Sequence, residues 1–185
     1  MKKVFITHGH KGFPNGAWRP WLMTELEKKG IYACALPMPG FESPNCKEWG
    51  NEIKGQVDLN LNDDIYLVGH SLGGTAILSY LEENDSMRIG GVVLVSTPVE
   101  KTRIDEINNF FEKPFNYENI KSKSQKFTII HGTDDKYVPS QQAEKLSKSL
   151  DGELILIPNG GHLSGSEGFH TLPEVLKSLL ETMGE

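Results

Sequence analysis

The sequence predicts an α/β domain: a three-layer, doubly wound sheet of six mainly parallel strands with helices on both faces. Three observations point to this class. Short apolar runs recur along the chain, and most are continuous rather than alternating, which is typical of strands buried on both faces. Amphipathic helical patterns lie between these runs, so right-handed crossovers would make neighbouring strands parallel. The length of 185 residues suits one core, and we expect residues 1–185 to form a single domain.

The expected elements alternate along the chain. The strands are six apolar runs at residues 3–8, 31–36, 64–69, 91–96, 127–131 and 153–157. The helices cover residues 18–29, 48–61, 71–83, 140–150 and 172–183. In most of these helices, apolar residues recur at three- or four-residue spacing. Gly30 provides a stop for the first helix, and Pro173 is tolerated in the first turn of the last one.

One connection is longer than the others. Residues 98–125 separate the fourth and fifth expected strands and contain several apolar residues, among them Phe110 and Phe111. Long connections in compact domains are often lids or binding segments, so a short cap or lid is one interpretation. The other is a pair of short helices that complete the core. The two interpretations do not exclude each other.

Charge and composition argue against several classes of protein. The formal net charge is −6 and no basic cluster occurs, so neither nucleic acid nor an anionic membrane surface is expected as a partner. No segment approaches roughly 18 consecutive apolar residues, and the N-terminus lacks the features of a signal peptide, so we expect a cytoplasmic protein. Cys34 and Cys46 provide neither a disulfide framework nor metal-ligand spacing.

The most informative motif is Gly69-His70-Ser71-Leu72-Gly73. It follows an apolar strand and opens into a helix, which is the context of a nucleophile elbow, a tight turn that exposes a serine at the sheet edge. The serine is flanked by glycines because larger side chains would clash with the crossing backbone. Ser71 is therefore the candidate nucleophile.

A serine nucleophile needs a base, and the base needs a third group to hold its tautomer. After the fifth expected strand, a Gly-x-x-Asp-x-x-Val-Pro spacing favours Asp135 as the acid, with Asp134 as a helper or a turn-capping residue. Asp134 stays open as the alternative acid. After the sixth expected strand, two glycines precede His162, which we favour as the base over the other five histidines.

Acyl transfer also needs N–H donors for the developing oxyanion. The backbone N–H of Leu72, at the start of the helix after the elbow, is one candidate. The second is the N–H of His10, because Gly9 lets the backbone turn after the first strand. The histidines and cysteines lack metal-ligand spacing, so we expect neither a metal nor any other cofactor.

Apolar residues in loops at the active edge are candidates to line the substrate pocket. They are Phe13, Trp18, Pro98, Phe110, Phe111, Phe115 and Leu163. No arginine or lysine is evident as a clamp for a charged acyl group. A small or medium-sized neutral ester is therefore the favoured substrate.

These motifs together resemble the α/β-hydrolase superfamily over nearly the whole chain. The resemblance is carried by residues 69–74, by 131–135 with the following Val138-Pro139, and by Gly160-Gly161-His162. The His-Gly loop directly follows the first strand, and an early Trp-containing helix comes next. Both features are similar to small serine hydrolases of the retinoblastoma-binding protein nine type and their bacterial relatives. The resemblance implies a minimal α/β-hydrolase fold with strand order 2-1-3-4-5-6.

The sequence thus predicts a cofactor-independent serine hydrolase that cleaves small carboxylic esters through a Ser71–His162–Asp135 triad and an acyl-enzyme. Thioester hydrolysis, amide hydrolysis and acyl transfer on the same triad stay open. The alternative is a protein-binding module with a vestigial triad, in which an exposed Trp18 or Trp21 would suit an interface. Nothing else in the sequence indicates a protein partner.

Overall fold

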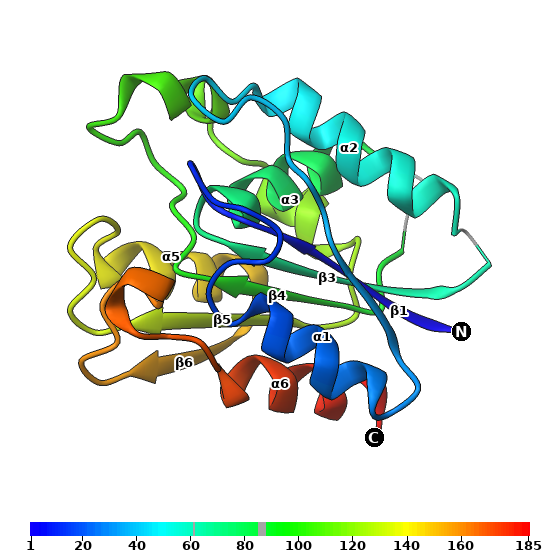
Figure 1. Ribbon diagram of the computed structural model, residues 1–185. Coiled ribbons are helices and arrows are strands. Elements are labelled where there is room, and N and C mark those ends of the chain that lie inside the picture. Colours follow the sequence, from blue (N-terminus) through cyan, green and yellow to red (C-terminus); the bar gives the residue numbers. More distant parts are fainter. Residues whose placement is uncertain (61, 85–87) are drawn as a thin grey trace.

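The computed structural model describes residues 1–60, 62–84 and 88–185. Figure 1 shows a central sheet with helices on both faces. The strands are β1 (Lys2–Thr7), β2 (Tyr32–Ala35), β3 (Asp64–His70), β4 (Gly91–Val95), β5 (Phe127–Gly132) and β6 (Glu153–Ile157). The α-helices are α1 (Arg19–Glu27), α2 (Cys46–Asp58), α3 (Leu72–Glu83), α4 (Tyr117–Lys121), α5 (Ser140–Leu150) and α6 (Pro173–Met183). Two short 3₁₀ helices are η1 (Asp105–Phe111) and η2 (Gly165–Glu167).

The six strands form one sheet in the order β2-β1-β3-β4-β5-β6, and every neighbouring pair is parallel. The predicted fold class and strand order are therefore confirmed. All residues of β4 and β5 are buried, whereas β6 at the sheet edge is partly exposed. This difference explains why the inner strands are continuously apolar, since both of their faces are covered by helices.

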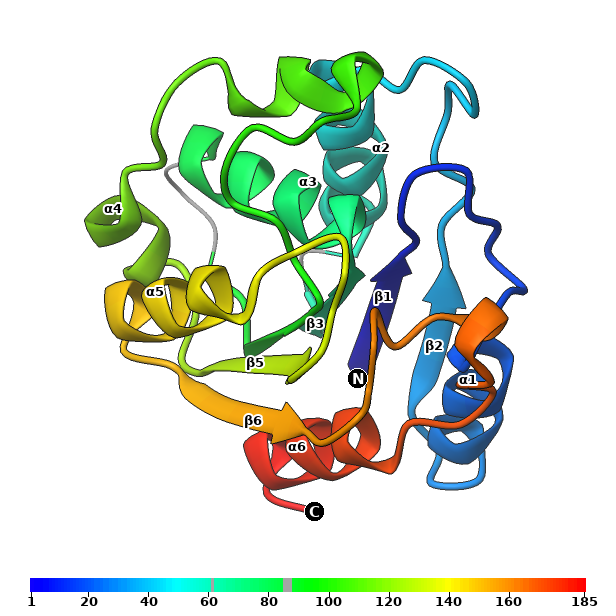
Figure 2. The ribbon, with the colours of Figure 1, turned by 90° about the vertical axis from the view of Figure 1, so that its left-hand side faces the viewer.

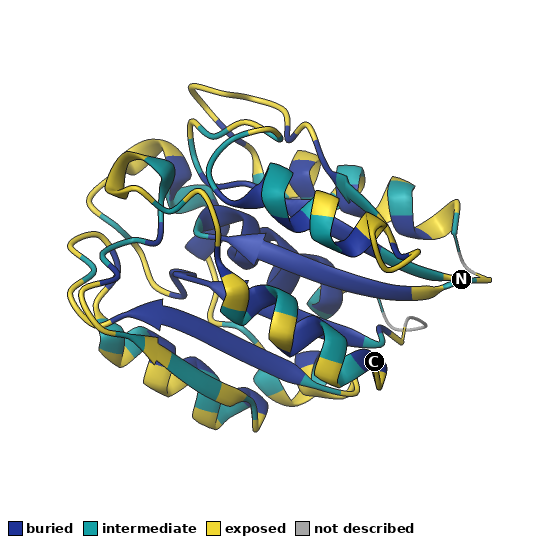
Figure 3. Ribbon diagram, turned by 60° about the horizontal axis from the view of Figure 1, so that its bottom comes forward, coloured by how far each residue is buried: buried dark blue, intermediate teal, exposed yellow. Residues whose placement is uncertain are grey.

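Two apolar clusters form the core, one on each face of the sheet. On one face, α1 and α6 pack against inward-pointing strand residues such as Val68 and Val95. On the other, α2, α3, α5 and the short helices pack against residues such as Leu67 and Leu94. Figure 2 shows α1 and α6 on the opposite side of the sheet from α2 and α3, and Figure 3 shows the buried strands between exposed helix surfaces.

The helix boundaries differ from the expected ones where a cap decides them. The helix expected over 48–61 begins earlier, at Cys46, because the side chain of Asn45 accepts hydrogen bonds from the N–H groups of Lys47 and Glu48. Its expected end, Leu61, lies outside the described residues. None of the helices in residues 1–60, 62–84 and 88–185 has the length and apolar character needed to cross a membrane.

The long connection after β4 contains two short helices, η1 and α4. Their apolar residues Ile107, Phe110, Phe111 and Ile120 are buried and belong to the core cluster of the α2–α3 face. These helices therefore help to complete the core. The role of residues 98–125 as a cap or lid stays a prediction.

Candidate active site

Ser71 stands at the turn between β3 and α3, with a φ of 53° and a ψ of −126°. A positive φ is strained for a residue with a Cβ atom. The backbone holds the turn in place: the N–H of Ser71 donates to Val95 O at 2.8 Å, and the N–H of Gly74 donates to Ser71 O at 2.9 Å. A strained serine between a strand and a helix is the geometry of a nucleophile elbow.

The glycines around Ser71 are required by close backbone contacts. A Cβ atom on Gly69 would lie 2.4 Å from the Cα atom of Gly74, and one on Gly73 would lie 2.6 Å from the carbonyl oxygen of His8. Neither backbone neighbour can move without displacing the turn or the end of β1. The Gly-x-Ser-x-Gly pattern therefore has a steric cause in this chain.

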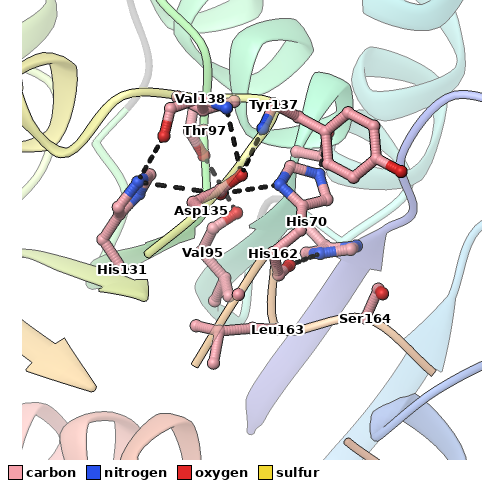
Figure 4. A network of polar contacts seen from close by, with 12 residues as sticks. His70, Val95, Thr97, His131, Asp135, Tyr137, Val138, His162, Leu163 and Ser164 are labelled. Atoms are coloured by element: carbon pink, nitrogen blue, oxygen red, sulfur yellow. Dashed lines mark hydrogen bonds and ion pairs between the residues drawn. The ribbon is translucent and has the colours of Figure 1, made fainter. Parts of the chain in front are cut away.

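Three loops bring Ser71, His162 and Asp135 together at the carboxyl edge of the sheet. His162 Nε2 lies 2.9 Å from Ser71 Oγ, and His162 Nδ1 lies 2.7 Å from Asp135 Oδ2. Nδ1–H donates to the carboxylate, which leaves Nε2 free to accept the serine proton. Figure 4 shows the Asp135 carboxylate between the rings of His131 and His162.

Burial and several hydrogen bonds fix the position of Asp135. The Asp135 side chain is fully buried, and its Oδ1 accepts hydrogen bonds from the N–H groups of Tyr137 and Val138 at 2.8 and 3.0 Å. His131 Nε2 donates to Val138 O at 2.9 Å and so fixes the same turn. Burial alone would raise the pKa of Asp135. The hydrogen bond from His162, the charge of His162 and the two N–H donors together outweigh burial, so the pKa of Asp135 is lowered.

Asp134 has a different neighbour. Its Oδ1 accepts a hydrogen bond from the N–H of Gly161 at 2.8 Å and thereby ties the loop after β5 to the loop that carries His162. The structure thus brings Asp135 to the imidazole and Asp134 to the backbone beside it.

Two further groups hold the His162 backbone, and the sequence analysis assigned neither of them to the site. His70 Nε2 donates to His162 O at 3.0 Å, and the two rings lie 5.2 Å apart between centroids. Glu167 Oε2 accepts from the N–H groups of His162 and Ser164, at 2.9 and 3.2 Å. The pattern Ser164-x-x-Glu167 is a capping box, so the bond from the Ser164 N–H was recognisable in the sequence, whereas the bond from the His162 N–H was not.

The protonation of these two groups suits their contacts. Burial is the main cause that lowers the pKa of His70 to about 3, so its ring is neutral near pH 7. The hydrogen bonds that Glu167 accepts outweigh its burial and lower its pKa, so it is ionised. Both therefore keep their hydrogen bonds to the His162 loop near pH 7.

The loop after β1 lies against Ser71. A Cβ atom on Gly9 would lie 2.9 Å from the Ser71 Cβ atom, so only a glycine permits this approach. His10 follows Gly9, and Leu72 is the first residue of α3, where an N–H has no acceptor within the helix. In the described part of the chain, no group of three or more His, Cys, Asp or Glu side chains is placed to hold a metal ion.

A cavity of about 300 Å³ opens beside Ser71 and His162; we call it the Ser71 pocket. Its described lining residues are Gly9, His10, Lys11, Gly12, Phe13, Gly16, Ala17, Arg19, His70, Ser71, His162, Ser164, Gly165 and Ser166. Most of them come from the loop after β1 and from the loop that follows His162.

Of the apolar residues expected to line the pocket, the structure brings only Phe13 into its described wall. Trp18 and Leu163 are fully buried in the core, where the indole N–H of Trp18 donates to Leu163 O at 3.1 Å. Pro98, Phe110 and Phe111 are also buried, and Phe110 and Phe115 line a separate cavity near α2. The large apolar side chains are used for packing, and this burial also removes Trp18 from any protein interface.

The parallel sheet, its strand order and the serine at the β3–α3 turn define an α/β hydrolase. The chain belongs to the serine hydrolase family, whose model matches residues 4–181. It is similar to YdeN of Bacillus subtilis, with 31% identity over 176 residues that cover 94% of this chain and 92% of the relative. It is also similar to the serine hydrolase RBBP9 of Rattus norvegicus, with 25% identity and coverages of 96% and 95%. The resemblance to this type of small hydrolase is thus confirmed.

Solved structures agree with the family. The crystal structure of the ydeN gene product from B. subtilis matches with a TM-score of 0.94 at 30% identity, and all of both chains is covered. Est1E from Butyrivibrio proteoclasticus matches with a TM-score of 0.80 at 19% identity, covering 100% of this chain and 89% of that one. The second likeness shows the fold alone.

Proposed function

We propose that this protein hydrolyses small carboxylic esters, or related thioesters and amides, through an acyl-enzyme on Ser71. The observation that carries the proposal is the continuous hydrogen-bonded path from Ser71 Oγ through His162 to Asp135. A hydroxyl, an imidazole and a buried carboxylate in this order are the parts of a serine triad. Membership of the serine hydrolase family supports the same conclusion.

The reaction follows from the roles of these groups. His162 Nε2 takes the Ser71 proton as Oγ attacks the carbonyl carbon, and Asp135 holds Nδ1–H and stabilises the imidazolium. The N–H groups of Leu72 and His10 are proposed to bind the oxyanion. The tetrahedral intermediate collapses, and the leaving alcohol takes the proton from Nε2. Water then gives a proton to His162 Nε2 as it attacks the acyl-enzyme. When the second tetrahedral intermediate collapses, Nε2 returns this proton to Ser71 Oγ and the acid is released.

A fluorophosphonate probe with peptide mapping tests the proposal. We expect one label per chain on Ser71 in the wild type, and none in Ser71→Ala. Ser122→Ala is the matched control. Ser122 is exposed at the end of α4 and does not belong to the triad, so this variant should be labelled like the wild type. Loss of the nucleophile of a serine triad can lower kcat by about 10⁶, so ester turnover by Ser71→Ala should fall to background.

Two outcomes would contradict the proposal. Ester turnover by purified Ser71→Ala would show that another group is the nucleophile. A folded wild type that resists the probe would favour the protein-binding module with a vestigial triad. Panels of matched ester, thioester and amide substrates then define the bond that is cleaved.

A further inference from the structure

Arg19, the first residue of α1, is a buried cation. Only 3% of it is exposed. Its Nε and Nη2 donate to a single carbonyl, Phe13 O, at 3.2 and 2.8 Å, and its Cζ lies 5.9 Å from the centroid of the Trp18 ring. Its Nη1 is buried with no hydrogen-bond partner among the described residues. A buried charge with an unpaired donor is costly unless a further group pairs with it.

The chain supplies no described carboxylate to neutralise Arg19. Burial lowers the pKa of Arg19 to about 10, so the guanidinium keeps its charge near pH 7. The neighbouring histidines do not compensate either. Burial chiefly lowers the pKa values of His8 and His70, and the charge of Arg19 lowers them further. The net charge of this cluster is therefore positive.

Arg19 forms part of the wall of the Ser71 pocket, and the rest of that wall has a similar character. Its described residues include Lys11 and three histidines but no aspartate or glutamate, although the whole chain carries a net charge of −6. Lys11 is exposed and paired with Glu42, at 2.9 Å, so Arg19 is the uncompensated cation. His10 Nε2 is a second buried nitrogen without a described partner.

We propose that the Ser71 pocket binds esters that carry a second, negatively charged carboxylate, and that Arg19 recognises this group. The inference rests on the proposed hydrolase function and names its substrate class. It replaces the expectation of a neutral ester, which depended on the apparent lack of a cationic clamp. Arg19 could not be identified from the sequence, because its place in the same pocket wall as Ser71 depends on how the loop after β1 packs against the elbow.

The chemistry of the pocket explains the selectivity. A carboxylate can accept a charge-assisted hydrogen bond from the guanidinium, which is stronger than a bond between neutral groups. A neutral acyl chain would leave the charge unpaired in a desolvated site, which penalises the wrong substrate. A volume of about 300 Å³ suits a short dicarboxylic monoester.

The experiment compares esters that differ only in charge. Monomethyl succinate and monomethyl glutarate carry the carboxylate on the acyl side, and acetoxyacetate carries it on the alcohol side. Each is paired with its primary amide analogue, and hydrolysis is followed by NMR. We expect the wild-type kcat/KM to be at least about tenfold higher for the anion than for the amide in one of the two arms, and that arm identifies the side of the ester that Arg19 contacts.

Variants at Arg19 assign the preference to this residue. Arg19→Met should reduce the anion-to-amide ratio to within about twofold of unity, whereas Arg19→Lys, which keeps the charge, should retain part of it. Arg103→Met removes an exposed charge and is the matched control, with an unchanged ratio expected. If circular dichroism shows that Arg19→Met is unfolded, the anion-to-amide ratios of the wild type and Arg19→Lys decide whether the inference holds.

Several results would overturn the inference. One is a wild-type preference for the amides. Another is an unchanged ratio in Arg19→Met, which would leave Arg19 as a support for Phe13 O alone. Failure to hydrolyse any of the three anionic esters by a wild type that the fluorophosphonate labels would also overturn it. Failure of both labelling and hydrolysis would instead count against the proposed hydrolase function.

Discussion

The two halves of the Ser71 site are held in different ways. In the half that carries His162 and Asp135, the groups that position the reacting atoms are paired: the Asp135 carboxylate accepts three hydrogen bonds, and Asp134, His70 and Glu167 hold the backbone around His162. His131 Nδ1 is buried there without a described partner, but His131 is not among the described residues that line the Ser71 pocket. In the other half, formed by the loop after β1 and the start of α1, two buried nitrogens that belong to pocket-lining residues, His10 Nε2 and Arg19 Nη1, have no described partner.

The difference separates two tasks. Paired groups fix the reacting atoms before a substrate arrives, which lowers the reorganisation needed in the transition state. Unpaired buried donors instead leave hydrogen-bonding capacity for a ligand, at a cost in folding free energy. Side-chain substitutions in the paired half should therefore change the rate. Side-chain substitutions in the unpaired half, which keep the backbone N–H of His10, should chiefly change which substrate is bound.

After the loss expected for Ser71→Ala, the next largest effect is expected for Asp135, compared with its neighbour Asp134. Asp135→Asn places an amide where Nδ1–H needs an acceptor, which favours the wrong tautomer, so kcat should fall by about 10⁴. Asp134→Asn keeps an oxygen that can accept from the Gly161 N–H, so its kcat should fall by less than about tenfold. Steady-state kinetics on one ester measures both. A greater loss in Asp134→Asn would reverse the assignment of the two carboxylates.

The sequence was sufficient for the parts of the site that rest on local chain geometry. The elbow glycines, the spacing before Val138-Pro139 and the glycines before His162 all lie at strand ends. Parallel strands bring these ends to one edge, so the meeting of Ser71, Asp135 and His162 was predictable. The fold class was predictable for a related reason, because continuous apolar runs between helical patterns indicate a parallel sheet.

The sequence was insufficient where side-chain placement depends on packing. Aromatic residues near the active edge were equally good candidates for the pocket and the core, and only the three-dimensional packing separates the exposed Phe13 from the buried Trp18 and Phe110. Arg19 was missed for the converse reason, since a charged residue on an amphipathic helix is normally solvated. The sequence contains no local sign that this one is buried.

Acid should also lower the free energy of unfolding of the protein through His70, which lies in the paired half. Its pKa is about 3 in the folded protein and 6.5 ordinarily, so between these values the unfolded chain binds a proton that the folded one does not. The free energy of unfolding then decreases as the pH falls from about 6.5, by about 1.4 kcal/mol per pH unit for one such group. Urea unfolding between pH 6.5 and pH 4.5 measures this slope.

His70→Gln sharpens the test, because glutamine cannot take up the proton. His8 and His131 also have lowered pKa values, so a slope should persist in this variant but be smaller by about 1.4 kcal/mol per pH unit. The exposed His170→Gln is the control and should keep the wild-type slope. A wild-type slope in His70→Gln would mean that another group causes the acid sensitivity.

The smallest effect is expected at Phe13, in the unpaired half. Phe13 is 57% exposed, lines the Ser71 pocket and stacks on Phe41 with ring centroids 5.2 Å apart. Phe13→Ala should raise KM by about two- to fivefold and leave kcat within about twofold, since one partly exposed aromatic contact contributes about 1 kcal/mol or less. Phe41→Ala breaks the same stack but removes no described lining residue, so it should change KM less. A large loss of kcat in Phe13→Ala would show that the loop after β1 also orders the reacting groups, and the division between a rate-setting half and a selecting half would no longer hold.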